Sequence, residues 1–338
     1  MADRPHSPAA SADPARPPGE DAALSGRAVL GLGLAAVGRP GYINLGRDRD
    51  LPPGRGVDDL RRRTRELLDL AWERGVRHFD TARSYGRAEE FLAGWLDDAP
   101  RRGAVVSSKW GYTYTAGWRV EAEAHEVKDH SLATFERQRA ETKALLGDRL
   151  DVYQIHSVTP DSPALTDPAL LRALAALAER GVLVGLSTSG PAQGDAVRAA
   201  LEVEVAGEPL FRCVQSTWNP LEPSVGPALA EAHAAGLRVM VKEAMANGRL
   251  SAPRGAAAAV LGPPAEAAGA TPDAFALAAA LHQPWADVVL SGAATTAQLE
   301  SNLAARDVRL APQVLEALAE AAEEPGAYWR HRAELPWS

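Results

Sequence analysis

Short apolar segments alternate with longer amphipathic segments between residues 28 and 305, and this alternation restricts the fold more than any other property of the sequence. The short segments are rich in β-branched residues and nearly continuously apolar, as in strands that are buried on both faces. The longer segments place apolar residues at helical spacing. The predicted strands are residues 28–37, 75–79, 104–109, 150–156, 182–188, 213–218, 237–242 and 287–291, and the predicted helices are residues 58–74, 89–96, 129–146, 168–179, 192–203, 224–235, 271–282 and 296–305.

Eight consecutive strand–helix units are the number that closes a (β/α)8 barrel, so we predict an α/β fold of the TIM-barrel type. One domain is expected over residues 26–338, with an extra C-terminal helix at residues 312–323. An open, doubly wound sheet is the alternative, but no predicted strand leads through Gly-x-Gly-x-x-Gly into a helix. Residues 1–25 are rich in Pro, Ala, Asp and Arg and lack the apolar residues of a core, so we expect a disordered N-terminal tail.

Composition and charge exclude several classes of function. The net charge is −8 and the isoelectric point about 5.6, which argues against non-specific binding of nucleic acid or anionic membranes. No apolar run approaches the roughly 20 residues of a membrane span, and residues 1–25 have no secretory apolar region. The single cysteine, Cys213, fits a reducing compartment. We expect a cytoplasmic monomer or small homo-oligomer that acts on a small molecule, with no nucleic-acid or membrane partner and no metal.

Three consecutive predicted strands end in ionisable residues. Asp80 and Tyr85 follow the second strand, Lys109 ends the third and His156 ends the fourth. In this fold the active site forms at the carboxyl ends of the strands, and neighbouring strands lie about 4.8 Å apart. We therefore expect these four side chains to meet at one rim of the barrel.

The four groups suit proton transfer to a carbonyl oxygen. The phenol of tyrosine has a pKa near 10, and a neighbouring ammonium such as Lys109 is expected to lower the pKa of Tyr85 by favouring the phenolate. Asp80 would keep Lys109 charged, and His156 would orient the substrate oxygen. Because side chains cannot supply a hydride, the site also implies a hydride-carrying cofactor.

The segment Phe79-Asp-Thr-Ala-Arg-Ser-Tyr-Gly86, followed by Ser108-Lys109 and Gln154-Ile-His156, resembles the signature of the aldo/keto reductases in order and spacing. The resemblance extends over roughly residues 25–324. It implies an NAD(P)-dependent oxidoreductase that transfers hydride between nicotinamide and an aldehyde, ketone or sugar. The resemblance implies that Tyr85 is the general acid/base and that Lys109 adjusts the pKa of Tyr85. It also implies that Asp80 holds Lys109 in place and that His156 orients the substrate.

The same resemblance implies cofactor contacts on later strands. Gln215 and Ser187 would hold the carboxamide, Trp218 would stack on the nicotinamide, and Thr188 stands where the family often has Asn, which leaves its role open. Lys242, next to Glu243, would contact the pyrophosphate or form an ion pair at the rim. The helix that follows the last strand would receive a cofactor phosphate, through Gly292, Ala294, Thr295, Gln298 and Asn302.

The choice between the two nicotinamide cofactors is less clear from the sequence. The family favours NADP(H), whose 2′-phosphate usually binds a cation, preferably Arg. No Lys or Arg lies between Gly292 and Asn302, which leaves NAD(H) open. The long loop at residues 39–56 follows the first strand and is placed to cover the site, and residues 245–250 are expected to fold over the pyrophosphate.

Substrate identity does not follow from the sequence. A partly aromatic pocket is expected from Tyr42, Trp110, Tyr112, Trp118 and the tail at residues 328–332. In that tail Arg330 and Arg332 are expected to be solvated, and recognition of an anionic group is the alternative. Two other classes of function stay open. One is a non-catalytic nicotinamide-binding redox sensor or regulatory subunit, and the other is a Schiff-base lyase that uses Lys109 or Lys242.

Overall fold

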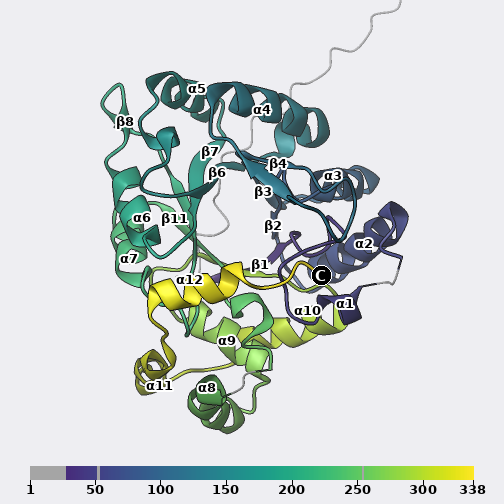
Figure 1. The fold of residues 1–338 in the computed structure, drawn as a ribbon, viewed down its shortest axis with the longest axis vertical. Helices are drawn as coiled ribbons and strands as arrows, with labels where there is room; N and C mark the ends of the chain where they lie inside the picture. The colour runs from purple at the N-terminus through teal and green to yellow at the C-terminus, as the bar shows by residue number, and fades with distance from the viewer. Residues whose placement is uncertain (1–27, 52–53, 253–254) are drawn as a thin grey trace, which may run out of the picture.

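Eight parallel strands close into a barrel in a computed structural model that describes residues 28–51, 54–252 and 255–338 (Figure 1). The order around the barrel is β1-β12-β11-β10-β7-β6-β3-β2. The strands are β1 Val29–Gly33, β2 His78–Asp80, β3 Val105–Trp110, β6 Val152–Val158, β7 Leu183–Thr188, β10 Cys213–Thr217, β11 Arg238–Lys242 and β12 Val288–Ser291. The predicted barrel is confirmed, and the predicted N-terminal tail lies outside the described residues.

Eight helices form the outer ring and cover the strands, as predicted (Figure 1). Their ends differ from the predicted ends by a few residues, which is usual for helix termini. They are α2 Val57–Glu73, α3 Ala88–Asp98, α4 Leu132–Leu146, α5 Pro168–Ala178, α6 Gln193–Leu201, α7 Gly226–Ala234, α9 Pro272–Leu281 and α10 Thr296–Leu303. Within the described residues, no helix is long and apolar enough to cross a bilayer.

Several short elements were not predicted. An antiparallel hairpin, β4 Tyr112–Tyr114 and β5 Glu126–Lys128, occupies the connection between β3 and α4, so that α4 begins three residues later than predicted. The loop at residues 39–56 contains a one-turn helix, α1 Arg47–Asp50, and a helix with two internal prolines, α8 Gly255–Ala267, precedes α9. A second small hairpin joins β8 Glu204–Val205 to β9 Glu208–Pro209.

The C-terminal region also differs from the prediction. The single helix expected at residues 312–323 is a short helix, α11 Pro312–Ala317, that continues as a 3-10 turn to Ala321. A further helix, α12 Pro325–Ala333, then lies across part of the barrel mouth (Figure 1). The segment at residues 328–332 is therefore a helix that packs on the barrel rather than an extended tail.

The interior of the barrel is polar at its carboxyl end and apolar at its amino end. On β10, Cys213 and Gln215 point to the same side because side chains alternate along a strand. The thiol of Cys213 is fully buried and lies 3.4 Å from the sulfur of Met240, in a layer completed by Val152 and Val288. Burial raises the pKa of this thiol to about 12. The apolar layer supports the polar one above it.

Candidate active site

A buried ion pair lies at the centre of the polar layer. The ammonium of Lys109 lies 2.5 Å from Asp80 Oδ2 and also donates to the carbonyl of Thr81 at 3.0 Å. The other carboxylate oxygen of Asp80 accepts from Ser107 Oγ at 2.7 Å and from Gln215 Nε2 at 3.1 Å. The side chains of Lys109 and Asp80 are 0% and 4% exposed. The predicted partnership of these two residues is thus present in the geometry, and each charge has several hydrogen bonds.

Tyr85 lies in the turn after β2, with its ring beside the ion pair. The Lys109 ammonium is 5.1 Å from the centre of the ring, and the ring of His156 packs edge-on at 5.6 Å. Two glycines allow this turn to pack closely against the chain after β1. A Cβ atom at Gly38 would lie 2.3 Å from the carbonyl oxygen of Tyr85, and Gly86 has a φ of 61°, which favours glycine. Local sequence therefore fixes where the phenol lies.

The protonation states differ in one respect from the expectation. Burial and the nearby charge of Asp80 raise the pKa of Tyr85 well above 10, although Arg39 partly offsets them. The expected lowering of this pKa by Lys109 is not observed, because burial is the largest cause of the shift and raises the pKa. Burial, together with the charges of Lys109 and Lys242, lowers the pKa of His156 well below 6.5. The site thus contains a protonated phenol and a neutral imidazole at neutral pH.

His156 is held by contacts from two loops. Its backbone carbonyl accepts a hydrogen bond from the His130 ring at 2.8 Å, and its own Nδ1 lies 3.5 Å from Ser84 Oγ. The ring of Tyr112, from the β4–β5 hairpin, packs against it at 5.0 Å. These contacts aim the imidazole toward Tyr85, so that one small group in the cavity can reach both.

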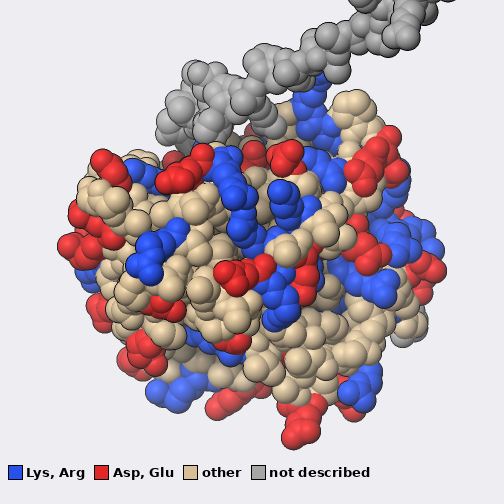
Figure 2. Space-filling view, turned by 90° about the horizontal axis from the view of Figure 1, so that it is seen from above, with Lys and Arg blue, Asp and Glu red and all other residues tan. Residues whose placement is uncertain are grey.

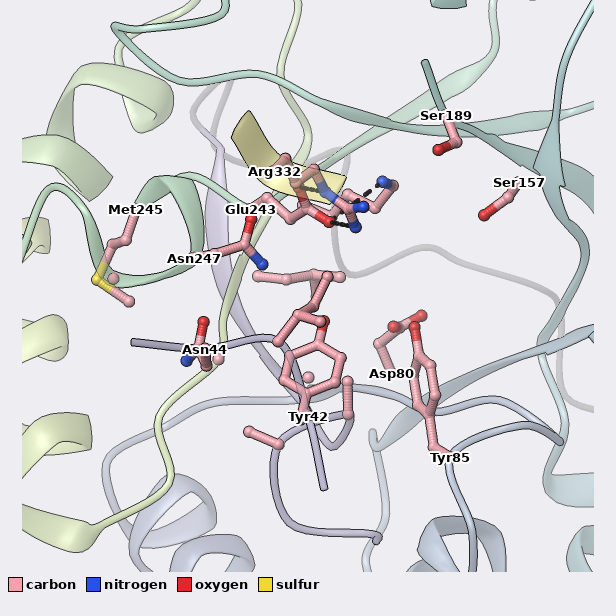
Figure 3. Close-up of a pocket in the computed structure, with 18 of the residues that line it drawn as sticks. Tyr42, Asn44, Asp80, Tyr85, Ser157, Ser189, Glu243, Met245, Asn247 and Arg332 are labelled. Atoms are coloured by element: carbon pink, nitrogen blue, oxygen red, sulfur yellow. Dashed lines mark hydrogen bonds and ion pairs between the residues drawn. The ribbon is translucent and has the colours of Figure 1, made fainter. Parts of the chain in front are cut away.

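A cavity of about 270 Å3 opens above these residues. Figure 3 shows Asp80 and Tyr85 on one side of it and Glu243 and Arg332 on another. Six of the predicted site residues line this cavity, and they are Asp80, Tyr85, His156, Gln215, Lys242 and Gly292. The structure therefore brings together the predicted catalytic group and part of the predicted cofactor group.

Seven predicted cofactor contacts lie outside the cavity lining: Ser187, Thr188, Trp218, Ala294, Thr295, Gln298 and Asn302. Ser187 Oγ accepts a hydrogen bond from the backbone of Ser157 at 2.8 Å, and Thr188 Oγ1 lies 2.7 Å from Ser216 Oγ. Trp218 packs edge-on against Trp285 at 5.8 Å and is 7% exposed. The side chains of Ser187, Thr188 and Trp218 thus contact other side chains and the backbone of the barrel, and their contact with a nicotinamide stays a prediction.

The residues that were predicted to receive a cofactor phosphate lie around the start of α10. Thr295 Oγ1 accepts from the backbone of Gln298 at 3.1 Å, and Gln298 Oε1 accepts from the backbone of Ala294 at 2.9 Å. The amide of Gln298 also donates to Asp50 of α1 at 2.8 Å. Asn302 lies further along α10, where its amide oxygen accepts from Ser291 Oγ at 2.8 Å and its amide nitrogen donates to Asp273.

The two loops that were expected to cover the site meet over the cavity. The backbone of Leu45 donates to the carbonyl of Asn247 at 3.0 Å, and Gly248 packs against Leu45. Asn247 lines the cavity, and its amide oxygen is buried with no hydrogen-bond partner among the described residues. A donor from a bound molecule would therefore be accommodated at Asn247.

Arg332 was expected to be solvated, and that expectation is wrong. Its guanidinium forms a two-pronged ion pair with Glu243, at 2.8 and 2.5 Å. Lys242 lies 3.7 Å from the same carboxylate and donates to Thr217 Oγ1 at 2.8 Å. Although burial opposes it, the charges of Arg332 and Lys242 lower the pKa of Glu243 to about 2. Burial lowers the pKa of Lys242 to about 8. Arg330, by contrast, is 72% exposed, as expected.

Arg39 was missed by the sequence reasoning. It is 2% exposed and donates to the Ser84 carbonyl at 2.9 Å and to Glu126 at 2.8 Å. Its guanidinium lies 5.4 Å from the centre of the Tyr85 ring and 4.8 Å from that of Trp337. No local motif marks this residue, because its partners come from distant parts of the chain.

The expected aromatic pocket is present in part. Tyr42 and Tyr112 line the cavity, and Trp337 was an unexpected member of the lining. Trp110 is fully buried against Phe135, and Trp118 packs on α3, so that neither lines the cavity. The result is a cavity with aromatic walls and charged residues that are mostly paired.

Comparison with known proteins agrees with this geometry. A family model for the aldo/keto reductase family matches residues 58–323. A pyridoxal 4-dehydrogenase from Microbacterium luteolum is 28% identical over 219 residues, which is 56% of this chain and 63% of that protein, so the chain matches less than two thirds of its relative.

Two solved structures share the fold. An aldo-keto reductase from Bacillus halodurans superposes with a TM-score of 0.64 at 19% identity, over 87% of this chain and 92% of the other. A glycerol dehydrogenase from Gluconobacter oxydans gives a TM-score of 0.65 at 21% identity, over 86% and 90%. The barrel, the polar rim and the family model together show that this chain belongs to the aldo/keto reductase family.

Proposed function

We propose that this protein is an NAD(P)-dependent oxidoreductase that interconverts a carbonyl compound and its alcohol, with Tyr85 as the general acid/base. The observation that carries the proposal is the position of the Tyr85 phenol. It lines the cavity beside the neutral ring of His156 and next to the Lys109–Asp80 ion pair. Because its pKa lies above 10, the phenol is protonated at neutral pH, which is the state that a proton donor to a carbonyl oxygen requires.

Residues around the cavity fit a nicotinamide dinucleotide. Gln215 has its amide at the cavity, Lys242 provides a cation, and Asn247 has an unsatisfied amide oxygen. Gly292, before α10, has open space where a side chain would be. These residues would hold the cofactor, which supplies the hydride when bound. The family generally uses such cofactors.

The proton side of the reaction can then be assigned to this chain's own residues. His156 would donate a hydrogen bond to the substrate oxygen and place it near Tyr85. Tyr85 would give its proton to that oxygen as the carbon is reduced. Lys109 would stabilise the resulting phenolate, and Asp80 would keep Lys109 protonated and in place.

The charges near α10 favour NAD(H) over NADP(H), against the general preference of the family. The carboxylate of Asp50 binds Gln298 at 2.8 Å, close to where the adenosine half would lie. An acidic group suits a ribose hydroxyl and repels a 2′-phosphate. No Lys or Arg between Gly292 and Asn302 compensates this charge.

The test measures the consumption of reduced nicotinamide cofactor in the presence of a panel of carbonyl compounds. The absorbance of the reduced cofactor gives the rate. The panel includes pyridoxal, glyceraldehyde and aromatic aldehydes, because of the names of the relatives and the aromatic cavity walls. We expect the wild type to turn over with NADH faster than with NADPH, and Tyr85→Phe to bind cofactor without turnover. Normal turnover by Tyr85→Phe would show that the proposed mechanism is wrong.

The same assay tests the redox-sensor alternative, and chemical trapping tests the lyase alternative. Cofactor that binds to the wild type but is never oxidised by any carbonyl would indicate a redox sensor. A Schiff-base lyase needs a neutral lysine amine, whereas Lys109 is held in an ion pair with Asp80. Borohydride trapping of an adduct on Lys242 would be the result that favours the lyase.

A further inference from the structure

A second, larger hollow lies at the amino end of the barrel, opposite the candidate active site. Its volume is about 960 Å3, and it lies between the starts of β3, β6 and β7 and the carboxyl ends of α3, α4 and α5. We call it the lower hollow. Six basic residues line it, and they are Arg101, Arg102, Arg139, Lys143, Arg149 and Arg180.

Two of the six are fixed in place by other parts of the chain. Arg149 donates to Asp97 at 2.6 Å and to the carbonyl of Leu146 at 3.0 Å. Arg101 stacks over the ring of Trp95 at 4.4 Å, with only 15% of its side chain exposed. These two arginines give the lower hollow a rigid base, so a bound anion would not have to order them.

The other four cations are available for a ligand. Among the described residues, Arg102, Arg139, Lys143 and Arg180 form no ion pair. Figure 2, which looks onto the α4 and α5 side of the molecule, shows Lys and Arg side chains on this face, with Asp and Glu side chains among them. The concentration of positive charge is unusual because the whole chain carries a net charge of −8.

Helix dipoles do not account for this cluster. Each carboxyl end of α3, α4 and α5 carries roughly half a negative charge, which basic side chains stabilise. The three ends together amount to about 1.5 negative charges. Asp148 adds one more, and Asp151 already accepts a hydrogen bond from the backbone of Val106 at 2.8 Å. Asp69 and Asp97 pair with the two anchored arginines, so the helix ends, at about 1.5 negative charges, do not by themselves match the four unpaired cations.

The floor of the lower hollow indicates the kind of anion. Apolar side chains lie beneath the cations, from Leu96, Ala104, Val106, Leu150, Leu177 and Val182. Five of the six basic residues are arginines, whose planar fork matches phosphate oxygens. The volume is in the range of pockets for small organic ligands. We propose that the lower hollow binds a multiply charged phosphate ester that also carries an apolar or aromatic portion.

The experiment measures binding of ATP, inorganic tripolyphosphate and adenosine by calorimetry at low salt, with saturating NADH present to occupy the candidate active site. We expect ATP to bind more tightly than tripolyphosphate, which lacks the apolar portion, and adenosine not to bind. The double variant Arg102→Glu/Arg180→Glu should weaken ATP binding at least about tenfold, equal to about 1.4 kcal/mol. Both positions are exposed, so folding should be unaffected.

Arg309→Glu is the matched control, because it makes the same change at an exposed position outside the lower hollow. It should leave ATP binding within about twofold of the wild type, since distant surface charges are screened. Absence of ATP binding, equal binding by the wild type and the double variant, or equal loss in Arg309→Glu would overturn the proposal. So would binding of an acidic peptide alone, which would indicate a protein partner. If the proposed function fails and NADH does not bind, ATP binding at the candidate active site would be equal in the wild type and the double variant, so the loss specific to Arg102→Glu/Arg180→Glu still tests the lower hollow.

Discussion

The Lys109–Asp80 ion pair gives the sharpest test of the energetics of the site. Lys109→Met keeps most of the length of the side chain but removes the charge. The Asp80 carboxylate, 4% exposed, would then keep only its neutral donors Ser107 and Gln215. Removing one partner of a buried ion pair costs about 3–5 kcal/mol, because the remaining charge stays buried without compensation. We expect Lys109→Met to lower the free energy of unfolding by about 4 kcal/mol.

The double variant Asp80→Asn/Lys109→Met removes both charges and therefore the uncompensated charge. Replacing both members of a buried pair by neutral groups is often close to neutral for stability. We expect the double variant to lose about 2–3 kcal/mol less stability than the two single variants lose together, which is within the range of coupling energies for residues in contact.

Urea unfolding followed by circular dichroism measures the free energy of unfolding of Asp80→Asn, Lys109→Met and the double variant. With a slope of about 3 kcal/mol per molar urea, a loss of 4 kcal/mol lowers the midpoint by about 1.3 M. Lys143→Met is the matched control, because Lys143 is exposed and forms no ion pair among the described residues, and it should change stability by less than about 0.5 kcal/mol. A loss below about 1 kcal/mol in Lys109→Met, or strictly additive effects, would refute the reasoning.

Two further predictions follow from the packing and from the buried histidines. Gly38→Ala should reduce turnover strongly, because its Cβ would lie 2.3 Å from the Tyr85 carbonyl oxygen. The control Gly94→Ala, in open space on α3, should keep turnover and raise the free energy of unfolding by up to about 1 kcal/mol. Equal turnover in both variants would contradict the packing argument. Burial lowers the pKa of His78 to about 4 in the folded protein, from 6.5 in the unfolded chain. Neutral His78 therefore costs no stability above pH 6.5, and the free energy of unfolding falls as the pH drops toward 4, because only the unfolded chain binds the proton. His78→Gln should therefore lose about 3 kcal/mol less than the wild type over that range, while exposed His331→Gln behaves as the wild type in urea titrations at each pH.

The barrel could be predicted from the sequence because parallel strands buried on both faces appear as continuous apolar runs. The positions of Asp80, Lys109 and His156 followed directly, since strand ends in a closed barrel share one rim. Arg39 and Arg332 could not be found in this way. Arg39 ion-pairs with Glu126, 87 residues away, and Arg332 with Glu243, 89 residues away, and neither contact has a local pattern.

The packing partner of Trp218 could not be predicted from the sequence. Trp218 follows the last residue of β10, so strand alternation no longer fixes its orientation, and it packs on Trp285. The direction of the pKa shift of Tyr85 was mispredicted for a related reason. The sign of its pKa shift depends on its burial and on the charge of Asp80 as well as on Lys109, and burial cannot be read from a motif.

The buried thiol of Cys213 makes this chain a convenient host for site-specific labels. The sequence contains one cysteine, and its thiol is fully buried with a pKa near 12, so maleimide reagents would leave it unmodified. A cysteine introduced at Val127, which is 51% exposed on β5, would be the single reactive thiol of the folded protein. A fluorophore there would report movement of the β4–β5 hairpin beside the cavity without any change to the native barrel.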